Sequence, residues 1–125
     1  MTACVVQDLW NRAYRLDEWH KETGVVIMGY DMYRTLSNAK HKKYKGKMKE
    51  IFQKTLVEPG PDLVICDEGH ILKNESTALS LAVNKMKTAR RIVLTGTPLQ
   101  NNLKECKSHL FHFTELECMV ILHGN

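Results

Sequence analysis

The sequence predicts an α/β domain in which a parallel sheet is flanked by helices. Three short apolar runs, at 24–30, 62–66 and 90–95, have the length and composition of strands. Segments with helical spacing of their apolar residues lie before and between these runs. Strands that alternate with helices favour βαβ units, and βαβ units build parallel sheets.

The individual elements follow from apolar spacing and from breaker residues. The run at 24–30 is apolar throughout, which is typical of a strand covered on both faces. Asp31, directly after it, is the expected N-cap of the next helix. The alternating proline and glycine of 58–62 form a strong breaker. Apolar residues at helical spacing predict further helices at 7–23, 48–57 and 74–86.

Size and composition suit one soluble domain. The chain has 125 residues, a net charge of +4 and 43% hydrophobic residues. No apolar run is long enough to cross a bilayer, and the first residues lack the pattern of a signal peptide. The four cysteines include no C-x-x-C pair, which suits a reducing, intracellular compartment. We therefore expect a protein that is neither exported nor embedded in a membrane.

A basic loop at 40–49 contains six lysines and no acidic residue. Such a block is typical of an electrostatic contact with nucleic acid. Its candidate DNA-binding residues are Lys42, Lys43 and Lys45. A solvated loop between two ordered elements explains the same composition equally well.

Two adjacent carboxylates, Asp67 and Glu68, follow the apolar run that ends at Cys66. In a parallel α/β sheet, ligands bind outside the carboxyl ends of the strands. A Mg²⁺ ion would offset the repulsion between the two acids, since it takes one or two carboxylates together with substrate phosphates. A surface turn without an ion is the alternative interpretation of the dipeptide alone.

The context of these acids resembles a known pair of motifs. "DEGH" (67–70) after one apolar run and "LTGTPLQNN" (94–102) after the next resemble motifs II and III of the superfamily 2 nucleic-acid-dependent ATPases, in the branch of the Swi/Snf-type chromatin remodellers. The likeness covers 14–105, and Gly69 stands where the family usually has alanine. It implies a partial, incomplete RecA-like lobe of the P-loop NTPase type, with ATP and Mg²⁺ as cofactors, DNA or chromatin as partner, and the nucleus as location.

The resemblance also implies roles for single residues. Asp67 would bind Mg²⁺ at the nucleotide phosphates, Glu68 would act as the general base that positions water, and His70 would link the nucleotide site to the neighbouring motif. Tyr30 and Asp31 lie where the family often meets the DNA backbone, although the family more often has glutamate at the second position. Coupling of nucleotide state to DNA contact would fall to Thr95, Gly96, Thr97, Gln100 and Asn101.

Two parts of a motor of this family are not found in the sequence. No glycine is followed by Lys-Ser or Lys-Thr, as a phosphate-binding loop requires, and no second lobe is present. We therefore do not expect the chain alone to hydrolyse ATP at a useful rate. Its tail, 106–125, does not resemble the family's continuation; a truncated transcript, a gene-model error and a fragment would all explain this.

Two competing functions remain open: part of an ATP-dependent DNA translocase, and a non-catalytic module that binds DNA or a chromatin partner. An RNA helicase of the DEAD or DEAH type is disfavoured, because its third motif is typically of a Ser-Ala-Thr type. Zinc binding by the tail is also disfavoured by the spacing of its candidate ligands, which are Cys106, His109, His112, Cys118 and His123.

Overall fold

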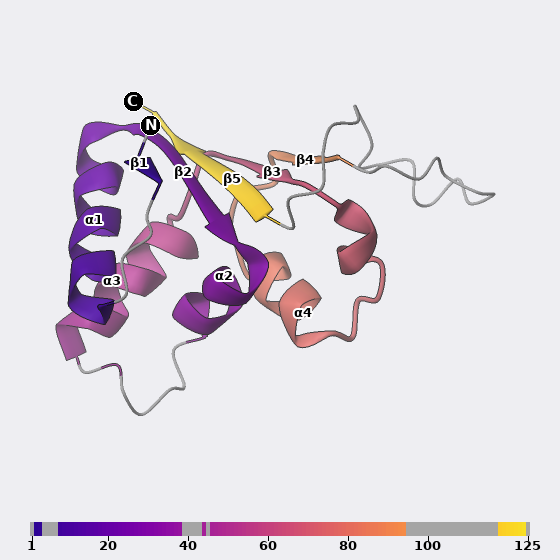
Figure 1. Cartoon of the computed structure of the whole chain (residues 1–125), viewed down its shortest axis with the longest axis horizontal. Coiled ribbons are helices and arrows are strands. Elements are labelled where there is room, and N and C mark those ends of the chain that lie inside the picture. The colour runs from indigo at the N-terminus through magenta and orange to yellow at the C-terminus, as the bar shows by residue number, and fades with distance from the viewer. Residues whose placement is uncertain (1, 4–7, 39–43, 45, 95–117, 125) are drawn as a thin grey trace.

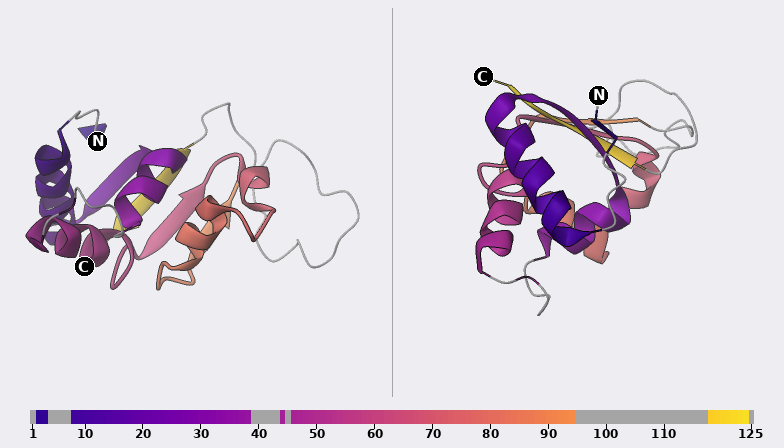
Figure 2. Two further views of the ribbon diagram at one scale, coloured as in Figure 1. Left: turned by 90° about the horizontal axis from the view of Figure 1, so that it is seen from below. Right: turned by 60° about the vertical axis from the view of Figure 1, so that its left-hand side comes forward.

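The computed structural model describes residues 2–3, 8–38, 44, 46–94 and 118–124. These residues form one α/β unit, so the predicted fold class is confirmed at that level. Within them the helices lie on one side of the sheet, as the views in Figure 1 and Figure 2 show.

The sheet has five strands in the order β1-β2-β5-β3-β4. The strands β1 and β2 are parallel to each other, as are β3 and β4, but β5 runs antiparallel to both of its neighbours. The prediction of a parallel sheet is therefore wrong for the sheet's centre. The strands are Thr2–Ala3 (β1), Gly24–Gly29 (β2), Leu63–Cys66 (β3), Arg91–Val93 (β4) and Cys118–His123 (β5).

The α-helices confirm the predicted segments in outline. Their bounds are Leu9–Glu22 (α1), Tyr30–Ser37 (α2), Gly46–Leu56 (α3) and Ala78–Asn84 (α4), with a 3₁₀-helix at Gly69–Leu72 (η1). The helix α3 begins inside the basic loop, two residues before the predicted start. The helix α4 begins four residues later than predicted, because Asn74 holds a turn in which its Oδ1 accepts the Ser76 backbone N–H at 3.0 Å.

Side chains cap two of these helices, but Asp31 is not one of the caps. Asp8 accepts the Trp10 backbone N–H at the start of α1, and Thr77 accepts the Ser80 backbone N–H at the start of α4. At α2 the N-cap position belongs to Gly29, which makes no side-chain cap, and Asp31 lies inside the first turn. The predicted cap at Asp31 is therefore wrong, although an acidic residue in a first turn still suits the helix dipole.

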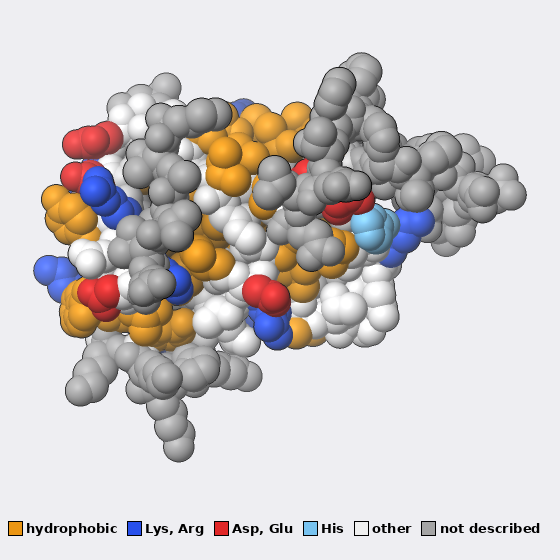
Figure 3. Space-filling model, in the orientation of Figure 1, with side chains coloured by type: hydrophobic (Ala, Val, Ile, Leu, Met, Phe, Trp, Pro, Cys, Tyr) orange, Lys and Arg blue, Asp and Glu red, His pale blue; other side chains and the backbone are white. Residues whose placement is uncertain are grey.

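The hydrophobic core lies between the sheet and the helices. In β2, Val26 and Met28 point inward and are buried, whereas Val25 and Ile27 on the other face are 38% and 37% exposed. The prediction that this strand is covered on both faces is therefore wrong among the described residues, and Figure 3 shows apolar side chains at the surface over the strands. The largest fully buried apolar side chains are Tyr33, Phe52, Leu36, Leu56, Met119, Ile121 and Val64.

Candidate functional site

The turn that carries the two carboxylates begins where β3 ends. The Asp67 backbone N–H donates to the Cys118 carbonyl of β5 at 3.0 Å, so the turn starts with Asp67 still bonded to the sheet. One carboxylate oxygen of Asp67 accepts the backbone N–H of Glu68 at 3.0 Å. The other oxygen makes no hydrogen bond to the described residues, which leaves Asp67 able to bind a cation.

Glu68 has a left-handed backbone conformation, with φ 49° and ψ 49°. This region is uncommon for a residue with a side chain and costs about 1–2 kcal/mol, and such residues cluster at functional sites. The Glu68 carboxylate lies 3.0 Å from Nδ1 of His70, and its side chain is 22% exposed. The structure thus brings the two predicted residues Glu68 and His70 into contact at the surface of the turn.

Gly69 packs closely against the neighbouring strand. Its backbone N–H donates to the Leu94 carbonyl at 2.8 Å, which draws the turn against the chain that continues from β4. A Cβ atom at Gly69 would lie 1.7 Å from Cγ1 of Val93. This contact gives a physical reason for glycine where the resembled family usually has alanine, and the departure itself was the available sequence signal.

Tyr30 also holds the acidic turn in place. Its hydroxyl donates to the backbone carbonyl of Asp67, and the residue is only 5% exposed. Burial raises the pKa of the Tyr30 hydroxyl, so it stays a hydrogen-bond donor. Burial also raises the pKa of the adjacent Cys66 thiol to about 11. Tyr30 therefore has a positioning role that the sequence did not indicate, and little of its surface is open to DNA.

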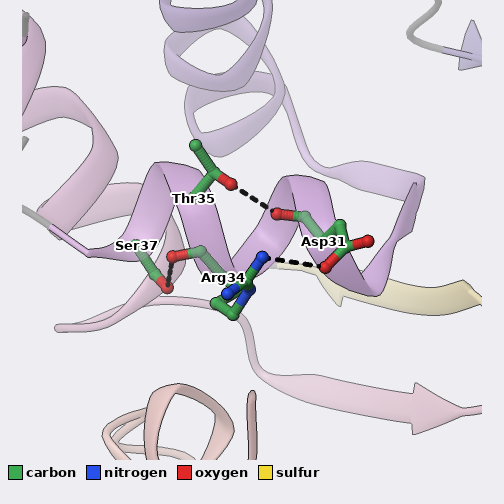
Figure 4. Close-up of polar contacts among 4 residues, drawn as sticks. All are labelled: Asp31, Arg34, Thr35 and Ser37. Carbon is green, nitrogen blue, oxygen red and sulfur yellow. Dashed lines mark hydrogen bonds and ion pairs between the residues drawn. The ribbon is translucent and has the colours of Figure 1, made fainter. Parts of the chain in front are cut away.

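Asp31, the other candidate for DNA contact, is at the surface. Figure 4 shows its carboxylate directed to Arg34 one turn along α2. The ion pair between Arg34 Nη2 and Asp31 Oδ1 has a length of 3.1 Å, and the Asp31 side chain is 94% exposed. Its backbone carbonyl accepts the Thr35 hydroxyl at 2.7 Å. A contact between Asp31 and DNA stays a prediction.

The parallel pairing of β3 and β4 places Asp67 and Leu94, the residues that follow the two strands, at the same end of the sheet. Cys66 and Val93 are register partners, so the chain leaves both strands side by side. The second motif itself, Thr95, Gly96, Thr97, Gln100 and Asn101, lies outside the described residues, as do Lys42, Lys43 and Lys45. Tyr44, which lies between Lys43 and Lys45 in the sequence, is buried against Phe52, at 5.4 Å between ring centroids.

Two of the candidate zinc ligands can be placed. Cys118 and His123 are the first and last residues of β5, about 16 Å apart at the usual rise of a strand. They therefore cannot bind one ion together. Cys106, His109 and His112 lie outside the described residues. Within the described part of the chain, no three His, Cys, Asp or Glu side chains are grouped to hold a metal ion.

The ligands available at the acidic turn nevertheless suit Mg²⁺, the ion that the sequence analysis predicts. Mg²⁺ needs only one or two protein carboxylates when substrate phosphates and water complete its shell. Asp67, with one carboxylate oxygen not engaged by described residues, supplies that kind of ligand. A 190 Å³ cavity between α1, β2 and α2 lies elsewhere, and neither Asp67 nor Glu68 lines it.

These features define the class of protein. It is an α/β unit with an acidic turn at the carboxyl end of a parallel strand pair. The model of the SNF2-related domain matches residues 2–120, and the chain belongs to this family.

The individual relatives include "Transcriptional regulator ATRX homolog" of Drosophila melanogaster, 60% identical over 79% of this chain and 8% of the relative. "Transcriptional regulator ATRX" of Homo sapiens is 58% identical over 75% of this chain and 4% of the relative. "Helicase ARIP4" of Homo sapiens is 41% identical over 76% of this chain and 8% of the relative.

The chain thus spans less than a tenth of the length of these relatives. No solved structure matches it significantly. Among the described helices, none combines the length and the apolar character that crossing a membrane would need.

Proposed function

We propose that this chain is part of the first, RecA-like lobe of an ATP-dependent DNA translocase that remodels chromatin in the nucleus. The observation that supports this most is the acidic turn of Asp67 and Glu68, held at the carboxyl end of β3 beside β4. The likeness to proteins named as ATRX transcriptional regulators and as a helicase supports the choice of DNA and chromatin over other substrates.

In this proposal Asp67 binds Mg²⁺ at the phosphates of ATP, and Glu68 orients and activates the attacking water. Phosphoryl transfer depends mainly on positioning and on stabilising charge, so the rigidity of the turn matters as much as its acids. The hydrogen bonds from Tyr30 to Asp67 and from Gly69 to Leu94 supply that rigidity. His70, in contact with Glu68, couples the turn to the second motif.

A second candidate is a non-catalytic module that contacts DNA or a chromatin partner without turnover. The sequence favours it for the isolated polypeptide, since no Gly-Lys-Ser or Gly-Lys-Thr loop occurs in these 125 residues. Under this alternative the purified chain binds DNA, and ATP is not consumed.

The test uses a complete ATRX motor in which residues 14–105 of this chain replace the matching segment. Glu68→Gln removes the base and leaves the cation ligand, so ATP hydrolysis should fall by at least 100-fold, while nucleotide binding changes less than about threefold. Hydrolysis is measured by phosphate release with saturating DNA, and nucleotide binding by a fluorescent ATP analogue.

Glu75→Gln is the matched control, because it makes the same chemical change at an exposed acid outside the turn. It should leave hydrolysis unchanged. Near-normal turnover in the Glu68→Gln motor would overturn the assignment of Glu68. DNA binding by the 125-residue chain, together with no ATP turnover by the motor that carries the unaltered residues 14–105, would favour the second candidate.

A further inference from the structure

Two histidines from distant parts of the chain meet at the end of the central strand. His20 lies in the last turn of α1, and His123 is the last residue of β5. Their rings are stacked, with 4.2 Å between ring centroids and 9° between ring planes. The Trp19 indole packs edge-to-face on both rings, at 6.0 Å from His20 and 5.8 Å from His123. This cluster therefore fastens the end of β5 to α1.

The strand that ends in this cluster holds the described sheet together. β5 lies between β2 and β3, which do not pair with each other in that sheet. His123 is in register with Gly24 of β2, and the neighbouring Leu122 carbonyl accepts the Asp62 N–H at 2.8 Å. The two histidines thus lie where the joining strand would begin to separate from its neighbours.

The surroundings of the two rings suit one added proton but not two. Nδ1 of His123 lies 3.0 Å from Oδ2 of Asp62, so a protonated His123 has a counter-ion, although the geometry is not that of a hydrogen bond. Nε2 of His20 is buried and has no hydrogen-bond partner among the described residues. Both nitrogens of a protonated ring are donors, so a charged His20 would leave a buried N–H without a partner and would face a second positive ring.

The other charged groups around His20 do not remove this conflict. Burial, then His123 and Lys54 of α3, lower the pKa of His20, while the Gly60 backbone and Asp17 act in the opposite direction. When the end of β5 opens, His20 is solvated and no longer faces His123, so the open state binds the proton more readily. The closed state is therefore fully favoured above pH 6.5, the usual pKa of histidine, and loses its advantage as the pH falls through the lowered pKa.

We propose that His20 and His123 form a pH-sensitive latch on the central strand of the sheet. The latch is closed while His20 is neutral. When His20 gains a proton beside His123, the His123 end of β5 separates from β2 and β3, whereas the Cys118 end stays paired. The release is local, because the repulsion acts at one end of the strand only.

Two backbone amides report on the two ends of β5. The Asp62 N–H donates to the Leu122 carbonyl at 2.8 Å beside the latch, and the Asp67 N–H donates to the Cys118 carbonyl at 3.0 Å at the far end. Hydrogen exchange of both amides is followed by NMR on the whole chain between pH 8 and pH 5, as protection factors that correct for the intrinsic effect of pH. As the pH falls, protection at Asp62 should decrease by about tenfold more than protection at Asp67.

A variant of His20 tests whether the latch causes this difference. His20→Phe keeps a flat ring against His123 but takes up no proton. The ratio of the two protection factors should then vary by less than about twofold over the same pH range. His41→Phe is the matched control, because it makes the same chemical change at a histidine of the basic loop, and it should keep the pH-dependent ratio.

A second measurement needs no variant. The ring protons of His20 are titrated by NMR in the unaltered chain, and their midpoint should lie below pH 6.5 and coincide with the loss of protection at Asp62. Equal loss at Asp62 and Asp67 would mean that acid opens the sheet as a whole. A loss at Asp62 that persists in His20→Phe, or a His20 midpoint at or above pH 6.5, would mean that another group drives the opening. Each of these three results overturns the latch.

Discussion

At the scale of single residues, the candidate site depends on a glycine that no ordinary side chain can replace without movement. Gly69 is buried, and the side chain of Val93 occupies the space that a Cβ atom would need. The backbone bond from Gly69 to the Leu94 carbonyl keeps the two segments at this close distance. The acidic turn is therefore held in place by packing against the chain after β4 as well as by its own hydrogen bonds.

Gly69→Ala should consequently destabilise the chain even though the resembled family usually has alanine there. Overpacking of this kind costs about 1–3 kcal/mol of unfolding free energy. The measurement is urea unfolding followed by circular dichroism. Gly124→Ala is the control and should change stability by less than about 0.5 kcal/mol, because nothing lies within 4 Å of a Cβ there. Equal stability of the two variants would contradict the close contact with Val93.

A second residue-scale prediction concerns His20. Its ring is stacked on His123, with Lys54 and Asp17 as the other charged groups acting on it. Burial and then the proximity of His123 lower the pKa of His20 below its usual value of 6.5. The unfolded chain thus binds this proton more readily, so the stabilisation is complete above pH 6.5 and is lost as the pH falls through the lowered pKa.

Unfolding free energies measured between pH 8 and pH 5 should therefore decline below about pH 6.5. His20→Phe keeps a flat ring against His123 and should reduce this decline, whereas His70→Gln, which alters an exposed histidine in the turn, should preserve it. A decline that is as steep in His20→Phe as in the unaltered chain would show that another group causes it.

At the scale of elements, the end of the predicted basic loop is helical. The helix α3 begins at Gly46, so Lys47 and Lys49 project from a helix and are exposed, while the side chain of Tyr44 is buried. Its hydroxyl donates to the Thr35 carbonyl at 3.2 Å. Lys47 and Lys49 thus have fixed positions on a helix from which to make an electrostatic contact.

We expect DNA binding by this block to depend on charge and not on base sequence. Lysine is a point charge without the planar fork that reads guanine. Replacing its six lysines by glutamine should flatten the dependence of log Kd on log salt, by about 0.9 for each phosphate that the variant no longer neutralises. The measurement is fluorescence anisotropy with two unrelated duplexes.

The control for this prediction is the double variant Lys73→Gln and Lys85→Gln, which removes exposed lysines from outside the block. It should change the salt slope less than the replacement of the block does. An unchanged slope in the six-residue variant would mean that the block is a solvated loop and that any DNA contact lies elsewhere.

At the scale of the whole molecule, helices cover one face of the sheet and the described residues leave the other face partly open. Its outer residues are apolar across four strands, where Ile27, Val120, Ile65 and Ile92 follow one another in register. Ile27 and Ile92 are 37% and 36% exposed. The sheet of an α/β protein is usually covered on both faces, so the exposed apolar face lowers the stability of the isolated chain.

The purified chain should therefore be only marginally stable, with a broad thermal transition below the roughly 45–65 °C common for domains of this size. Circular dichroism gives the melt, and binding of an apolar dye reports the open face. Ile27→Thr keeps a β-branched residue and should lower dye binding without lowering the midpoint. A sharp, cooperative melt at high temperature would contradict the prediction.

The sequence by itself determined the elements that depend on local pattern. The apolar run before "DEGH" predicted a strand by its length, and the apolar spacing in 7–23 predicted a helix; the structure has both. The candidate role of Asp67 and Glu68 was likewise predicted from the sequence, since the acids directly follow the strand and form part of the "DEGH" motif.

Only the tertiary structure decided which strands are neighbours and which faces are covered. An apolar run such as "CMVILH" shows that a strand is possible, but strand direction and partners are set by residues far away in the chain. The same holds for Tyr30, whose bond to the Asp67 carbonyl spans 37 positions, and for Gly69, whose constraint is a side chain on β4. Local periodicity indicates which segments form helices and strands, whereas strand pairing, coverage of the sheet's faces and close contact arise only when distant segments meet.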